Sequence, residues 1–127
     1  MPLYHVDIAS VAASVDKKWI DNLLSHHTVP GVEHARQGIP RRLTIAALMH
    51  IVLIRRLTRD VGVPVRIAVS LASKALANQA GSVRLAPGLH LAVDHSQLAA
   101  EVESLVAEAV ESVVRARRGR PLGGARN

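Results

Sequence analysis

The sequence has no cysteine and no phenylalanine, and it contains one tyrosine and one tryptophan. The absence of cysteine excludes disulfides, thiolate metal sites and cysteine nucleophiles. With so few aromatic side chains, the core must consist of valine, leucine, isoleucine and alanine, which favours helices packed on helices. Apolar residues make up 49% of the chain. A chain of 127 residues with this composition predicts one domain, with at most an appended element.

Long apolar runs are also missing. The longest, Ile45 to Ile54, is about half as long as a membrane-spanning helix requires, and it ends at Arg55 and Arg56. The first ten residues do not combine a basic stretch with a long apolar run, as a secretory signal would. We therefore expect a cytoplasmic protein that has no membrane partner.

The residue patterns of catalysis and of metal binding are absent as well. We recognise no nucleophile, base and acid set and no glycine-rich phosphate loop, so we expect no enzymatic activity. The closest histidines are His26, His27 and His34, and they lack the cysteine or carboxylate spacing of a metal site. We expect neither a metal nor another cofactor.

Charge is distributed in blocks along the chain. The net charge of +6 and the isoelectric point near 11.1 suggest a polyanionic partner. Residues 36–66 contain seven arginines and one acid, residues 94–114 contain five acids and no lysine or arginine, and residues 115–127 contain five arginines and no acid. Such blocks indicate separate surfaces with separate roles.

Two short helices are predicted near the N-terminus. Asp7 is the expected N-cap of the first helix, which ends at Ser14 and Val15. Its small residues allow another helix to approach closely; they are Ala9, Ala12 and Ala13. Asp16 is the expected N-cap of the second helix. Its apolar stripe leaves the lysines and other polar residues facing solvent or a ligand, while we assign Trp19 to the core.

The middle of the chain predicts a small hairpin and a second pair of helices. Prolines and glycines between residues 26 and 44 forbid a continuous helix, and short extended pieces around Val32 and Leu43 are expected to pair. Thr44 is the expected N-cap of a nearly apolar, central helix that runs to about Val61. A further helix begins near Pro64.

The last third predicts a β-hairpin around Pro87 and Gly88, followed by an amphipathic helix that Asp94 caps. The apolar face of this helix comprises Leu98, Val102, Leu105, Ala109 and Val113. That face is suited equally to packing on its own domain and to pairing with a second copy of the chain. The Arg- and Gly-rich residues 117–127 predict a disordered basic tail.

In order and spacing, residues 4–76 resemble the DNA-binding domain of the mercury-resistance-regulator (MerR) family. The matching positions are Ala12, Val15, Pro30, Arg42, Ile54 to Leu57 and Gly62. The chain departs from the family pattern in three places. Ser14 stands where the turn usually carries glycine, Lys18 and Trp19 lie near the position of an Arg-Tyr pair, and Leu43 replaces an aromatic residue. Without cysteine or a sizeable effector domain, the family's metal or drug sensing does not carry over.

The resemblance implies a mainly α fold: a winged helix-turn-helix with a second helix pair, extended here by the C-terminal hairpin and amphipathic helix. We expect a DNA-binding domain over residues 1–78, a segment for dimerisation over 79–116 and the tail over 117–127. The implied function is a transcriptional regulator that binds double-stranded DNA as a homodimer, associated with the nucleoid. The recognition helix would enter the major groove.

The candidate DNA-binding residues are Lys17, Lys18, Asn22, Arg36, Gln37, Arg41, Arg42, Arg117, Arg118 and Arg120. The lysines are expected on phosphates at a helix N-terminus, and Asn22 on a base edge. The hairpin arginines suit the backbone or the minor groove, although Arg41 has an ion pair with Glu33 as its alternative. Residues 118–121 resemble the Arg-Gly-Arg-Pro core of an AT-hook, which binds the minor groove in an extended conformation.

Two rival functions remain open at this stage. In the first, the protein is an interaction module, such as an antitoxin or adaptor, that binds a protein partner through the C-terminal hairpin and helix. In the second, it is an architectural protein that coats DNA without regard to sequence, using the basic charge for affinity.

Overall fold

The structure, a computed structural model, describes residues 2–34, 38, 40–78 and 80–119. This part of the chain is mainly helical and includes two small antiparallel hairpins, as the sequence predicts. The elements in order are α1 (Val6–Ala13), α2 (Lys17–His26), β1 (Val32–Glu33), β2 (Arg42–Leu43), α3 (Ile45–Arg59), α4 (Val65–Ala77), β3 (Ser82–Ala86), β4 (Leu89–Ala92) and α5 (His95–Gly119).

Local hydrogen bonds explain where most of the helices begin. The hydroxyl oxygen of Thr44 accepts from the backbone N–H of Ala47 at 3.3 Å, and Asp94 Oδ1 accepts from the N–H of Gln97 at 2.9 Å. Both predicted caps are confirmed. The prediction for α1 is wrong, because the N-cap is His5 and the helix begins two residues earlier than a cap at Asp7 would place it. The ring of His5 accepts the capping bond from the N–H of Asp7. Asp16 occupies the N-cap position of α2 without making a side-chain capping bond.

The connection from α1 to α2 turns at Ser14, which is the C-cap of α1. Its backbone lies in the left-handed region, with φ of 56°. Glycine adopts this conformation without steric cost, whereas a residue with a Cβ is strained by about 1 kcal/mol or more. Serine therefore adopts this turn at a cost that glycine would not carry.

Replacing Ser14 with glycine is expected to raise the free energy of unfolding by about 0.5–1 kcal/mol, because the relief of strain exceeds the added entropy of the unfolded chain. Ser14→Val should lower it by about 1–2 kcal/mol, since β-branched residues tolerate positive φ poorly. Urea denaturation of both variants measures the two changes. Equal stability of the glycine and valine variants would contradict the strained turn.

The first hairpin joins the N-terminal segment in a small sheet. Val32 pairs with Leu43, and Glu33 pairs with Arg42, as the predicted hairpin around Val32 and Leu43 requires. Tyr4 forms a bridge to the other side of Leu43, with N···O distances of 2.7 and 2.8 Å. The Leu43 side chain is fully buried, so it anchors the base of the hairpin in the core.

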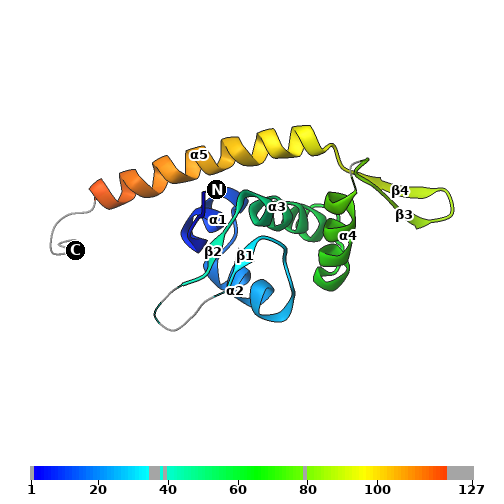
Figure 1. Cartoon of the computed structure of the whole chain (residues 1–127), viewed down its shortest axis with the longest axis horizontal. Coiled ribbons are helices and arrows are strands. Elements are labelled where there is room, and N and C mark those ends of the chain that lie inside the picture. Colours follow the sequence, from blue (N-terminus) through cyan, green and yellow to red (C-terminus); the bar gives the residue numbers. More distant parts are fainter. Residues whose placement is uncertain (1, 35–37, 39, 79, 120–127) are drawn as a thin grey trace.

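Helix α3 is the centre of the molecule, and α1, α4 and α5 all pack against it. Long α5 crosses α1 and α3 on the side opposite α2 (Figure 1). The residues of α5 that enter the core are Leu98, Val102, Val106 and Ala109. On α1, Ala9 and Ala12 are buried, and their small side chains permit the close approach that the sequence predicts.

Helix α5 packs on the N-terminal helices, which is one of the two arrangements that its sequence left open. Its apolar face completes the same core as residues 1–78, so residues 79–116 do not form a core of their own in the structure. Arg56 Nη2 on α3 also donates to Glu101 Oε2 on α5 at 2.8 Å. Helix α5 continues to Gly119, three residues into the segment that the sequence assigned to the tail.

Strands β3 and β4 project from the end of the molecule where α4 lies (Figure 1). The pairing runs from Ser82 with Ala92 to Ala86 with Leu89, and it confirms the hairpin predicted around Pro87 and Gly88. Leu85 and Leu89 are 44% and 56% exposed, which leaves apolar side chains on this hairpin in contact with solvent. No helix among the described residues has both the length and the apolar character needed to cross a membrane.

Candidate nucleic-acid interface

Helix α2 presents a polar face to solvent. Lys17, Lys18 and Asn22 are exposed, while Ile20 and Leu23 on the opposite side are buried in the core. This is the division that the apolar stripe predicts. Because the first turn of a helix has free N–H groups and a partial positive charge, the two lysines add to a site that attracts anions.

Asp7 of α1 brings the end of α5 to the start of α2. Its Oδ1 lies 3.0 Å from Lys17 Nζ, and its Oδ2 lies 3.8 Å from Arg117 Nη2. Nδ1 of His5 is 3.4 Å from the same carboxylate. One acidic side chain therefore gathers basic groups from two helices that are far apart in the sequence. All three basic side chains are largely exposed.

The hydrogen bond from Lys17 lowers the pKa of Asp7 below its usual value; burial opposes this, and the charges of His5, Lys17 and Arg117 add to it. A carboxyl group whose pKa is lower in the folded state stabilises the fold at pH values above its unfolded pKa, about 4, and this contribution disappears as the pH falls through the folded value. We therefore expect Asp7→Asn to be less stable than the wild type at pH 7.

The difference between the two proteins should shrink as the pH falls below about 4, because the carboxyl becomes protonated first in the unfolded state and then in the folded state. Urea denaturation at pH 7, 4 and about 2 measures it. Asp60→Asn, at the exposed C-cap of α3, is the matched control because Asp60 forms no ion pair within the described residues. An equal loss of stability by Asp7→Asn at all three pH values would contradict the assigned role.

Arg41 fastens the first hairpin to α2. Its Nη1 lies 3.2 Å from Asp21 Oδ1, and its Nη2 donates to Ser25 Oγ at 3.2 Å. The alternative partner that the sequence suggested, Glu33, is not the one used. The Arg41 side chain is only 22% exposed, so it orients the hairpin beside α2 and offers little free surface to a ligand.

Arg42, the next residue, lies opposite Glu33 in the hairpin and is half-buried. Its Nη1 atom is buried and has no hydrogen-bond partner within the described residues. The other predicted residues of the hairpin, Arg36 and Gln37, lie outside the residues that the structure describes, as does Arg120 of the tail.

Arg117 and Arg118 are exposed in the last turn of α5. Arg118 and Gly119 of the AT-hook-like motif belong to the helix, whereas an AT-hook binds in an extended conformation; residues 120 and 121 of the motif lie outside the described residues. What the structure supports here is a basic helix end whose Arg117 reaches Asp7 and therefore lies near the N-terminus of α2.

The sequence did not predict Asp7 as the meeting point of α1, α2 and α5. The contacts of Arg41 had a partial indication in the sequence, because Asp21 and Ser25 are four residues apart and therefore share one face of a helix. Trp19 is half-buried and packs against the core, as expected, although part of it lines a hollow that the sequence did not predict. No group of three or more metal-binding side chains occurs within the described part of the chain.

When the chain was compared with protein-family models, with curated proteins and with solved structures, none of them matched it.

Proposed function

We propose that the protein is a DNA-binding transcriptional regulator with a winged helix-turn-helix, in which α2 is the recognition helix and the β1–β2 hairpin is the wing. The observation that supports this most directly is the setting of α2. Its exposed face carries Lys17, Lys18 and Asn22. The hairpin is fastened beside it through Arg41, and the basic end of α5 reaches it through Asp7.

These parts have distinct roles in the proposed complex. Lys18 and Lys17 approach phosphates at the positive end of α2, and Asn22 reads a base edge in the major groove, where adenine is the natural partner of an amide. Arg42 and the wing follow the backbone or enter the minor groove. The arginines at the end of α5 add affinity through the release of counterions.

The regulator would act as a homodimer at the nucleoid, with two recognition helices about one turn of DNA apart. The apolar face of α5 that suited such pairing packs on α1 and α3 of its own chain. A contact between copies would therefore use other residues. Val110 and Val114 of α5 are each 38% exposed and lie outside the buried stripe.

A salt-titrated shift assay on the protein's own upstream DNA and on random duplex tests this function. We expect tighter binding to the upstream DNA at each salt concentration, by about 10³-fold or more, and a linear fall of log affinity with log salt. Equal affinity for any duplex would instead support an architectural protein that coats DNA. The absence of salt-dependent binding to either duplex would overturn the proposal.

A second candidate, a module that binds another protein, is favoured by one observation. Apolar side chains are exposed around the α3–α4 connection, α4 and the second hairpin; they are Val61 at 69%, Ile67 at 43%, Leu85 at 44% and Leu89 at 56%. Ile67 and Leu85 line the same open hollow, and exposed apolar residues that lie together mark interaction surfaces more often than isolated ones do. Copurification of a stoichiometric second protein, together with failure of the shift assay, would support this function instead.

A further inference from the structure

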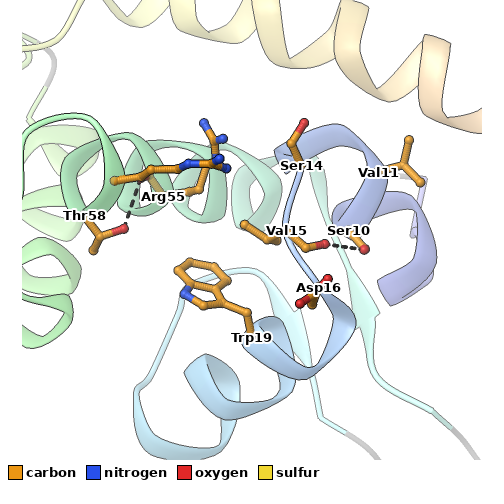
Figure 2. A pocket seen from close by; sticks show the side chains of 9 residues that line it. Ser10, Val11, Ser14, Val15, Asp16, Trp19, Arg55 and Thr58 are labelled. Atoms are coloured by element: carbon orange, nitrogen blue, oxygen red, sulfur yellow. Dashed lines mark hydrogen bonds between the residues drawn. The ribbon is translucent and has the colours of Figure 1, made fainter.

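An open hollow of about 690 Å³ lies between the α1–α2 connection and the C-terminal half of α3. Figure 2 shows Trp19 on its α2 side and Arg55 on its α3 side, with Val15 of the connection beside them. The size falls in the range of small-molecule sites, which is about 300–1,000 Å³. None of the residues assigned above to DNA binding lines this hollow.

The α3 side of the hollow is cationic. Arg55 and Arg59 both line it, and they are four residues apart, so they lie on the same face of the helix. Within the described residues neither arginine forms an ion pair, whereas the adjacent Arg56 pairs with Glu101. Two like charges at this spacing repel one another, and an anion between them would reverse that effect.

The Nε atom of Arg55 is buried and has no hydrogen-bond partner within the described residues. A buried donor without an acceptor destabilises the fold, and a guanidinium presents its donors as a planar fork that matches a carboxylate. The geometry of the arginines therefore suits an anion with planar, paired acceptor oxygens.

The rest of the lining combines apolar and aromatic side chains with the hydroxyls of Ser10, Ser14 and Thr58 and the carboxylate of Asp16, so the arginine side is where an anion is favoured. Val11 of α1 is 45% exposed, and Val15 and Trp19 are partly buried against the core while still lining the hollow. An indole face is a good surface for a second planar ring. A bare inorganic anion would leave the apolar part of the hollow unfilled, and a purely apolar molecule would leave the charges of Arg55 and Arg59 without a counterion.

From these two halves we propose that the hollow binds a small aromatic carboxylate, with its carboxylate between Arg55 and Arg59 and its ring against Trp19 and Val15. The ligand would bridge the α1–α2 connection and α3, and so would fix the start of α2 relative to the core. Binding to the hollow does not require DNA, so it is measured independently of the proposed function.

Trp19 is the only tryptophan in the chain, so its fluorescence reports on the hollow directly. We expect benzoate to quench it along a saturable curve, with a Kd of about 1 mM or tighter, which corresponds to at least about 4 kcal/mol. Cyclohexanecarboxylate, which lacks the aromatic ring, should bind more weakly. Benzyl alcohol, which lacks the charge, should give no saturable change. The indole N–H signal of Trp19 in a ¹H–¹⁵N NMR spectrum should shift along the same titration curve.

Arg55→Gln should weaken benzoate binding at least about tenfold, as expected for the loss of a charged hydrogen-bond partner. Arg59→Gln, at an exposed position, should also weaken binding and tests the site if Arg55→Gln folds poorly. The matched control is Arg66→Gln on α4, which lies outside the hollow and should bind as the wild type does. Lack of saturation with benzoate, equal binding of benzyl alcohol, or wild-type affinity in both Arg55→Gln and Arg59→Gln would overturn the proposal.

Discussion

Val102→Asp is expected to unfold the whole chain, not α5 alone. Val102 is fully buried where α5 packs on α1 and α3. Burying a valine contributes about 1.5–3 kcal/mol, and placing an unpaired carboxylate in its position costs several kcal/mol more. The sum is close to the entire stability of a typical domain, which is about 5–15 kcal/mol. Far-UV circular dichroism and the emission wavelength of Trp19 on α2 should together report the loss of structure.

Ala107→Asp is the matched control, because it introduces the same charge on the same helix at an exposed position. Its effect on stability should stay within about 0.5 kcal/mol. The alternative, in which α5 is a separate dimerisation element, makes the opposite forecast. Val102→Asp would then change the oligomeric state and leave residues 1–78 folded with Trp19 still packed. That outcome would support the division of the chain at residue 78.

The sequence predicted local features well because short-range chemistry determines them. Thr44 and Asp94 have side-chain oxygens that accept from N–H groups three residues later, and alternating residues around Pro87 and Gly88 define a hairpin. The start of α1 was missed because a histidine ring replaces the commoner aspartate cap. The end of α5 was misplaced because arginine is a good helix former, so a run of arginines need not end a helix.

The periodicity of apolar residues did not predict contacts between segments that are distant in the sequence. Helical periodicity predicted the apolar face of α5, but the same face fits an intramolecular core and a partner helix, so the sequence left both open. The candidate interface shows the same limit. Exposure of Lys17 and Lys18 followed from their position off the apolar stripe, whereas the contacts of Asp7 with α2 and α5 depend on the tertiary fold. The sequence likewise offered no reason to place Arg55 and Arg59 beside the α1–α2 connection, because that proximity depends on how α3 packs.

Lys18→Ala/Arg42→Ala is expected to weaken binding to the upstream DNA about 10- to 100-fold at physiological salt. Each cation that contacts a phosphate contributes about 0.9 to the slope of log affinity against log salt, so the double variant should lower the slope by about 2. Lys17→Ala should have a smaller effect than Lys18→Ala, because Lys17 already has Asp7 as an anionic partner at 3.0 Å. A shift assay across a salt series gives both the affinity and the slope.

Lys74→Ala/Arg84→Ala removes the same charge from α4 and β3, where both residues are exposed and no recognition role is proposed. If the proposed interface is correct, this control should retain the wild-type slope and nearly the wild-type affinity. Equal losses in the two double variants would show that binding depends only on net charge and not on a surface organised around α2. An unchanged slope in Lys18→Ala/Arg42→Ala, with Trp19 emission confirming the fold, would remove both residues from the interface, because counterion release is a direct count of phosphate contacts.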